Sequence, residues 1–339
     1  MAPMIFKQKE SADDVMRRPL WRTLLGYVLL ILLLINIGFG WYWSRSPDIF
    51  WVNQMPSGDS SVVGYATTDT LIRVAETLLD KPGGYLTNDV TPPSVFLDNI
   101  PNWELGVVQQ VRDLARVIRN DYSRSQSQSR EDSELAIAEQ KFFFDNNSWI
   151  LPRTESEYRQ GIVGFKDYRD RLSGVDAADA QFFSRADNLR EWLAQVEKRL
   201  GSLTRRLGDS VATDVINTDL AGERANEANT TLPDRVAVRT SWFEIDDVFF
   251  EARGTAWALV HFFRAAELDF GHVLADKNAE ASVRQIIREL EASLESLSSP
   301  MVMNGGGYGL FANHSLVMSN YLARANAAII NLRELLDEG

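Results

Sequence analysis

The sequence predicts an all-α protein, in which an N-terminal transmembrane helix precedes an elongated helical-bundle domain with coiled-coil-like seams. The first observation behind this prediction is an uncharged apolar run at residues 23–43. The second is a pair of long segments whose apolar residues alternate at spacings of three and four, as in helices that pack as coiled coils. The third is that no segment shows the convincing two-residue alternation of a strand, with Phe142-Phe143-Phe144 as the one exception left open. With 339 residues, 45% of them hydrophobic, the chain can bury a sizeable core.

The apolar run is long enough to cross a bilayer. At a rise of about 1.5 Å per residue, residues 23–43 extend about 31 Å, which matches the hydrocarbon thickness of a membrane. Trp21 at one end, and Trp41, Tyr42 and Trp43 at the other, are the aromatic residues expected at the two membrane–water interfaces. These four residues are therefore predicted to anchor the helix in a lipid bilayer.

The charges on either side of the run predict its orientation. Five basic residues precede it, namely Lys7, Lys9, Arg17, Arg18 and Arg22, whereas Arg45 is the only basic residue between the run and Arg73. Basic residues are retained on the cytoplasmic side, so the N-terminus is expected in the cytoplasm. The predicted organisation is a cytoplasmic tail (1–22), a transmembrane helix (23–43), a stalk (44–66) and a periplasmic helical domain (67–339).

A cleaved signal peptide is the alternative interpretation of this N-terminus, since Gly38-Phe39-Gly40 resembles a cleavage site. The acidic Glu10, Asp13 and Asp14 in the leader argue against it, as do the length of the apolar run and the bulky aromatic residues that follow. The membrane anchor is therefore the preferred interpretation.

Helical patterns follow the Ser-, Pro- and Gly-rich stalk. The first helix presents Leu71, Val74, Leu78 and Leu79 on one face and is expected to end at Pro82-Gly83-Gly84. A second is expected from about Trp103 to Ile118, with Asn102 as its N-cap, followed by a polar loop at residues 123–130. A third is expected to begin at a capping box, Thr154 with Glu157, and to continue to Leu172.

The two segments with the 3.5-residue period come next. The first seam consists of Phe182, Ala186, Leu189, Leu193, Val196, Leu200, Leu203 and Leu207. The second consists of Trp242, Ile245, Phe249, Ala252, Ala256, Leu259, Phe263, Ala266 and Phe270. We predict that they bury against each other as an antiparallel pair, joined by a long connection at residues 208–240 that can include some helix. Two further helices are expected near residues 283–297 and 316–336.

Charge and composition exclude several classes of function. The net charge of −12, without a basic stripe, argues against a nucleic-acid partner. The absence of cysteine excludes disulfides, thiol catalysis, Cys-ligated zinc and iron–sulfur clusters. No cofactor is therefore expected.

Four residues of the second seam's helix are the best candidates for acid–base or metal chemistry. Glu244, Asp247, Glu251 and His261 fall on one stripe, because their separations are multiples of the helical spacing. However, His261 is about 15 Å from Glu251 along a helix, and no histidine belongs to a Glu-x-x-His motif. We therefore expect a solvated acidic face with ion pairs to Arg253 or Arg264, and no metal centre.

Two weaker candidates lie elsewhere. The Asp145-Asn146-Asn147 segment resembles part of a calcium loop, and calcium would require it to fold onto the acidic stripe, so a turn is the default interpretation. His314-Ser315 suggests a hydrolase, but without a Gly-x-Ser-x-Gly elbow a histidine beside a helix start is expected to be a cap or contact residue. Glu104, Glu134, Glu157 or Glu251 would be the general acid of a glycan-cleaving enzyme, although no paired carboxylate is identified.

Several segments together resemble a known family. They are GYATTDTLIRVAETLLDKPGGYL at residues 64–86, LDNIPNWE at 97–104, the SRSQSQS loop, FDNNSW at 144–149 and the helix start Asn313-His314-Ser315. They resemble the uncharacterised bacterial membrane-protein family called domain of unknown function 2333. The resemblance covers nearly the whole chain and implies a protein of the bacterial inner membrane, but it assigns no activity, substrate or site residue.

The sequence therefore favours a membrane-anchored periplasmic scaffold or adaptor without catalytic activity, which binds an envelope protein or a second copy of itself. One alternative is an envelope enzyme that acts on a glycan or peptide through Glu, Asp and His residues. It predicts a pocket that contains a carboxylate of perturbed pKa. The other alternative is a ligand-sensing domain that works through a partner, because a tail of 22 residues is too short for an output module.

Overall fold

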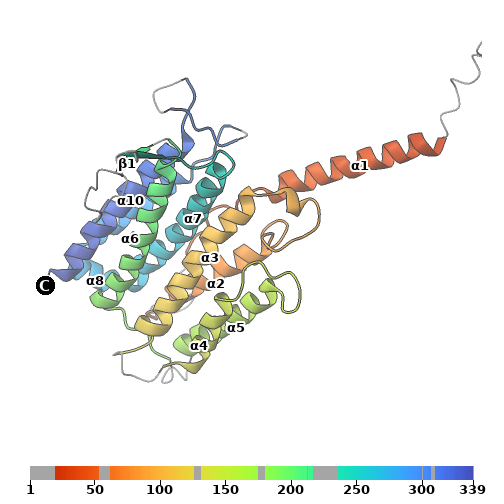
Figure 1. The fold of residues 1–339 in the computed structure, drawn as a ribbon. Coiled ribbons are helices and arrows are strands. Elements are labelled where there is room, and N and C mark those ends of the chain that lie inside the picture. Colours follow the sequence, from red (N-terminus) through yellow and green to blue (C-terminus); the bar gives the residue numbers. More distant parts are fainter. Residues whose placement is uncertain are drawn as a thin grey trace, which may run out of the picture.

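The computed structural model describes residues 20–52, 62–125, 131–174, 180–211, 213–216, 235–299, 301–306 and 310–338. Its α-helices are α1 (Leu20–Trp43), α2 (Tyr65–Asp80), α3 (Asn99–Val117), α4 (Ser133–Phe142), α5 (Thr154–Ser173), α6 (Ala186–Gly208), α7 (Ile245–Asp269), α8 (Gly271–Asp276), α9 (Glu280–Ser293) and α10 (His314–Asp337). A 3₁₀ turn, η1 (Ser94–Phe96), precedes α3, and a π-helical turn, η2 (Ile118–Tyr122), extends it. Figure 1 shows α1 projecting alone from a bundle of the other helices. The prediction of an all-α fold is confirmed.

One short ribbon departs from the helical pattern in the described part of the chain. Strand β1 (Thr213–Ile216) pairs with β2 (Arg235–Val238) in an antiparallel register that places Thr213 opposite Val238. The expectation of some helix between the two seams is wrong for these eight residues. Their β-branched residues favour extended backbone, but four residues per strand are too few to show a reliable alternation.

Two helix starts also differ from prediction. Asp98, not Asn102, caps α3, because its carboxylate accepts a hydrogen bond from the Asn99 N–H at 2.9 Å. At the start of α5, Thr154 does not form a capping box. Its hydroxyl donates to the Asp145 carbonyl at 2.8 Å, and Glu157 pairs with Lys141 instead. At the start of α5, tertiary partners have replaced the local hydrogen bonds of the predicted capping box, whereas the cap of α3 remains local and lies four residues earlier than predicted.

Both predicted seams are buried, but each has a different main partner from the one predicted. Helix α6 lies along α10, where the Ser319 hydroxyl donates to the Thr204 carbonyl at 3.0 Å and Arg333 pairs with Glu197. Helix α7 lies along α3 (Figure 1). Helices α6 and α7 touch where the rings of Trp192, next to the first seam, and Phe263 lie 4.8 Å apart. The 3.5-residue period therefore identified the buried face of each helix correctly and its main partner incorrectly.

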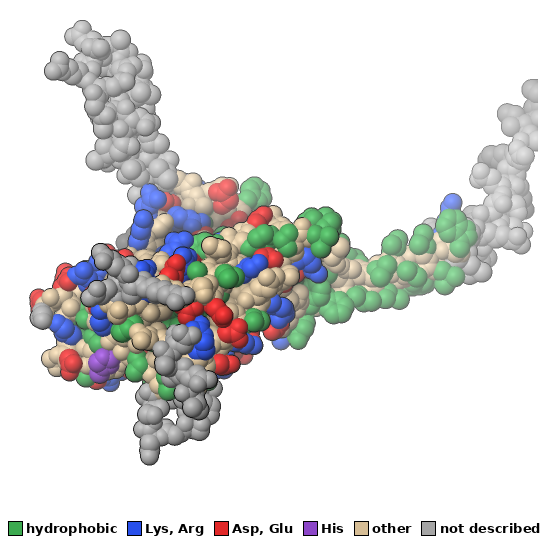
Figure 2. Space-filling view, turned by 90° about the horizontal axis from the view of Figure 1, so that it is seen from below, with side chains coloured by type: hydrophobic (Ala, Val, Ile, Leu, Met, Phe, Trp, Pro, Cys, Tyr) green, Lys and Arg blue, Asp and Glu red, His purple; other side chains and the backbone are tan. Residues whose placement is uncertain are grey.

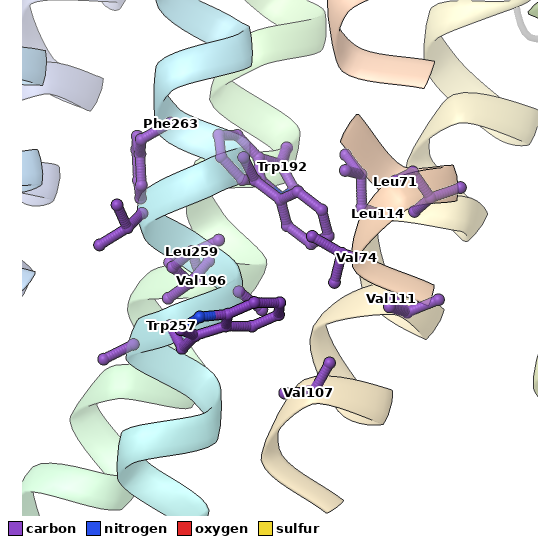
Figure 3. Close-up of a cluster of buried hydrophobic side chains, with 14 of the residues drawn as sticks. Leu71, Val74, Val107, Val111, Leu114, Trp192, Val196, Trp257, Leu259 and Phe263 are labelled. Carbon is purple, nitrogen blue, oxygen red and sulfur yellow. The ribbon is translucent and has the colours of Figure 1, made fainter. Parts of the chain in front are cut away.

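The described helices after α1 all contribute side chains to one core, and four of them meet in its central part. Figure 3 shows side chains of α2, α3, α6 and α7 in one cluster, among them Leu71, Val111, Val196 and Trp257. Trp242, the first residue of the predicted second seam, lies before α7 and is exposed, so the buried seam begins at Ile245.

Glycines allow α3 and α7 to approach closely. A Cβ atom on Gly106 would lie 2.1 Å from the Glu251 carbonyl oxygen, and one on Gly254 would lie 2.0 Å from the Trp103 carbonyl oxygen. No side chain fits at these distances, so the crossing requires glycine on both helices. This crossing places the first half of α7 directly on α3.

The segment that follows α1 contacts the domain. The Phe50 ring stacks on the His261 ring at 3.9 Å, and the Trp257 indole N–H donates to the Asp48 carbonyl at 3.3 Å. Arg73 of α2 donates to the Trp51 carbonyl at 2.9 Å. The described first part of the predicted stalk is therefore attached to α2 and α7.

Candidate functional site

Three of the predicted candidate residues meet in one surface cleft. Glu244 and Asp247 at the start of α7, and Glu251 one turn further on, line a cleft of about 460 Å³. Val248 of α7 also lines it, and the rest of the lining comes from the start of α3, the end of α6 and the segment before α7: Asn102, Leu105, Arg206, Asp209, Arg239, Thr240 and Ser241. The α3–α7 crossing brings these elements together.

Asp247 is the carboxyl group in this cleft whose ionisation is most altered. Burial, followed by the negative charges of Asp246 and Asp98 and of its two cleft neighbours, raises the pKa of Asp247 to about 6. The Asn102 amide donates a hydrogen bond to the Asp247 carboxylate at 2.6 Å. A carboxyl group with such a pKa can both donate and accept a proton near neutral pH.

Glu251 is not the solvated residue that the sequence predicted. Its side chain is buried, and it forms an ion pair with Arg206 of α6 at 2.8 Å. The predicted partners bind elsewhere, because Arg253 donates to the Leu294 carbonyl and Arg264 pairs with Glu291. The expectation of ion pairs to Arg253 or Arg264 is therefore wrong for Glu251.

Metal ligands do not converge in the described residues. No group of three His, Asp or Glu side chains there is placed to hold an ion. The segment proposed for calcium forms a turn, in which the Asp145 carboxylate accepts from the Asn147 N–H at 3.0 Å. The Asn146 carbonyl accepts from the Tyr85 hydroxyl, and none of the three residues lines the acidic cleft.

His261 lies away from the cleft and is fully buried. Its Nε2 atom accepts a hydrogen bond from the Phe50 N–H at 3.0 Å, and its Nδ1 atom lies 2.7 Å from the Trp257 carbonyl. These contacts require the neutral ring with the proton on Nδ1. Burial lowers the pKa of His261 to about 4, and the positive charges of Arg264 and Arg73 act in the same direction. His261 therefore joins the segment after α1 to α7.

This buried histidine predicts a loss of stability in acid. In the unfolded chain a histidine takes up a proton near pH 6.5, whereas in the folded chain this one stays neutral down to about pH 4. The stabilisation is complete above pH 6.5 and is lost as the pH falls toward 4, by about 3 kcal/mol. Urea unfolding at a series of pH values measures it. His261→Gln should remove this part of the pH dependence, and His272→Gln, at an exposed site, should retain it. Equal pH slopes in wild type and His261→Gln would contradict the assignment.

His314 has a structural role at the start of α10. Its backbone N–H donates to the Met303 carbonyl at 2.8 Å, and its Nδ1 accepts from the Met303 N–H at 2.9 Å. The preceding Asn313 caps the helix by accepting from the Leu316 N–H. The expectation that His314 is a cap or contact residue is confirmed.

One buried ion pair was not predicted from the sequence. Lys81 and Glu104 lie 2.5 Å apart, and neither side chain is exposed. The Glu104 carboxylate also accepts hydrogen bonds from the N–H groups of Leu86 and Thr87 and from the Thr87 hydroxyl. Glu104 therefore has a structural role: its hydrogen bonds and ion pair attach the loop after α2 to α3. The only signal was the position of Lys81 and Glu104 in two of the segments that carry the family resemblance.

A second buried carboxylate joins distant segments. Asp269, at the end of α7, accepts a hydrogen bond from the Thr67 N–H in the first turn of α2 at 2.6 Å. Burial raises the pKa of Asp269, and the N–H groups around it oppose that rise. A carboxylate at a helix N-terminus stabilises the helix, so Asp269 caps α2 from the far end of another helix.

The fold and these sites define an all-α protein with one N-terminal apolar helix, Trp21–Trp43, long enough to cross a membrane by its length and composition. The chain belongs to the family described as uncharacterized protein conserved in bacteria (DUF2333), whose sequence profile matches residues 15–339. The predicted resemblance is confirmed. No curated protein and no solved structure matched the chain significantly.

Proposed function

We propose that this chain is a single-pass protein of the bacterial inner membrane, with a cytoplasmic N-terminus, whose periplasmic helical domain is a scaffold or adaptor for another envelope protein. The side chains of α1 are almost all exposed and apolar, which suits a lipid environment. The five basic residues up to Arg22, in the first turn of α1, and the lone Arg45 between α1 and Arg73 support the orientation.

One observation carries the scaffold role: the membrane helix and the domain are joined by a segment bonded at several points. Phe50 binds His261 through its backbone and its ring, its carbonyl accepts from Arg264 at 3.3 Å, and the Trp51 carbonyl accepts from Arg73. Such attachment holds the domain at a set distance from the bilayer. A scaffold that presents a surface to a membrane partner needs this arrangement, whereas a tethered soluble enzyme does not.

Two measurements test this proposal. Alkaline phosphatase fused after Gly339 should be active, because it folds only outside the cytoplasm. The full chain, crosslinked in native membranes and purified, should carry a partner in a fixed ratio. Activity only of a cytoplasmic reporter would contradict the topology. A chain without partner or self-association would contradict the scaffold role.

The acidic cleft favours a second candidate, an envelope enzyme acting on a glycan or peptide with Asp247 as proton donor or acceptor. The raised pKa of Asp247 is the observation that supports it. Two structural facts favour the scaffold instead: Glu251 is neutralised by Arg206, and Asp247 lies in the first turn of α7, where acidic residues are common for helix stability.

An isosteric substitution separates the two candidates. In a strain that lacks the gene, Asp247→Asn should restore the wild-type envelope phenotype as fully as the matched control Asp246→Asn, because a scaffold does not use the proton. Complementation under envelope stress measures this. If Asp247→Asn fails to restore the phenotype while Asp246→Asn restores it, and the Asp247→Asn protein is folded and keeps its partner, the enzyme would become the better supported of the two functions.

A further inference from the structure

The end of the domain from which α1 leaves is built from two loops. The loop between α2 and α3 contacts α1 directly: a Cβ atom on Gly83 would lie 2.7 Å from the Trp43 ring, and one on Gly40 would lie 3.7 Å from Pro93. Figure 1 shows this loop and the loop between α4 and α5 on the side of the bundle where α1 begins to project.

The second loop is held against the first by hydrogen bonds. The Asn88 amide donates to the Ser148 carbonyl at 2.7 Å, and the Tyr85 hydroxyl donates to the Asn146 carbonyl at 2.9 Å. The Asn88 amide also donates to the Glu155 carboxylate at 2.9 Å. Both loops therefore have set positions relative to the last turn of α1.

Each of these loops exposes large apolar side chains. Val95, Phe96, Trp149, Ile150 and Leu151, which we call the apolar rim, are all more than half exposed, and Phe96 and Leu151 are 77% and 91% exposed. Figure 2 shows hydrophobic side chains on the domain beside the point where α1 leaves it. Exposing so much apolar surface to water is unfavourable, so the rim requires an apolar environment.

We propose that the apolar rim inserts into the headgroup region of the bilayer that α1 crosses, forming a second, peripheral membrane contact. This inference rests on the proposed membrane anchoring. Trp41 and Trp43 set the level of the membrane surface at the end of α1, and the loops that carry the rim begin at that level. Continuity with the anchor therefore favours lipid over a protein partner as the occupant.

The chemistry of the rim suits this depth. Tryptophan, phenylalanine and leucine side chains are favoured at the boundary between headgroups and acyl chains. Arg153, two residues after Leu151, pairs with Glu155 but keeps more than half of its side chain exposed, and Arg45 stacks on the Trp41 ring at 3.9 Å, so both guanidinium groups can meet lipid phosphates. With α1 and the rim both in lipid, the domain has two points of attachment and a defined orientation on the membrane.

The absence of cysteine makes a direct test simple. Two variants of the full chain carry a single cysteine each, Leu151→Cys and Phe96→Cys. Each variant is labelled on that cysteine with an environment-sensitive fluorophore and reconstituted into phospholipid vesicles. Phe39→Cys, in α1, is the positive control for anchoring. Ile330→Cys is the negative control, because Ile330 is partly exposed on α10, whose C-terminal end lies on the side of the bundle away from α1 in Figure 1.

Lipids that carry nitroxides at two depths then report the position of each label. We expect labels at positions 151 and 96 to lose fluorescence with the shallow nitroxide, the label at 39, about one helical turn inside Trp43, with both nitroxides, and the label at 330 only with aqueous iodide. If the label at 39 is quenched but the labels at 151 and 96 are not, the proposal that the rim inserts into the bilayer would be overturned, whereas the proposed membrane anchor would stand. If the label at position 151 is protected from iodide but is not quenched by the lipid nitroxides, the rim is covered by protein, and the proposal that it inserts into the bilayer would also be overturned. Absence of quenching at 39 would overturn the anchor and the rim together.

Discussion

Glu104→Ala should lower the free energy of unfolding by about 3–5 kcal/mol, because it leaves the buried Lys81 ammonium group without its counter-charge. The substitution also removes the acceptor for the N–H groups of Leu86 and Thr87. Urea unfolding of the full chain in detergent, followed by circular dichroism, measures the change.

An exposed ion pair beside the buried one is the control. Asp80→Ala breaks the pair with Arg159, in which both side chains are more than half exposed, and should cost no more than about 1 kcal/mol. The double variant Lys81→Met/Glu104→Gln should recover part of the loss, because it removes the uncompensated charge and keeps a side-chain oxygen. Equal small effects of Glu104→Ala and Asp80→Ala would show that Glu104 is not buried with Lys81.

Gly254→Val should cost roughly 3 kcal/mol, because overpacking of this kind forces the backbones of α3 and α7 apart. Its Cβ atom would lie 2.0 Å from the Trp103 carbonyl oxygen, and backbone atoms cannot move away as a flexible side chain can. The separation would also widen the acidic cleft, because Asn102 and Asp247 lie next to this crossing on opposite helices. Thermal unfolding measures the loss of stability.

A glycine in open space provides the comparison. A Cβ atom on Gly208, at the end of α6, would meet nothing within 4 Å, so Gly208→Ala should leave stability nearly unchanged or raise it slightly. A Gly254→Val protein that melts with the wild type would mean that α3 and α7 do not cross this closely.

The sequence predicted the candidate site in part. Glu244, Asp247 and Glu251 were expected on one face of one helix, and they do line one cleft. The sequence did not indicate that Arg206 would neutralise Glu251, because that contact depends on where the end of α6 lies. His261 was assigned to the same stripe, yet it contacts Phe50, a residue 211 positions earlier in the chain. Helical spacing relates residues on one helix and carries no information about the segment that covers them.

The sequence by itself predicted the longer helices and the buried faces of α6 and α7, because these properties follow from short-range spacing of apolar residues, but it did not predict the short helices α4 and α8. It also predicted the apolar helix at residues 23–43, which lies within α1 (Leu20–Trp43), because length and composition are local properties. Only the tertiary structure decided that α6 packs on α10 and α7 on α3, since one apolar seam fits many others and glycine positions and packing select among them. It also decided the roles of the buried charges. Lys81, Glu104, Asp269 and His261 are stabilised by partners from distant segments, and those partners become neighbours only when the chain has folded.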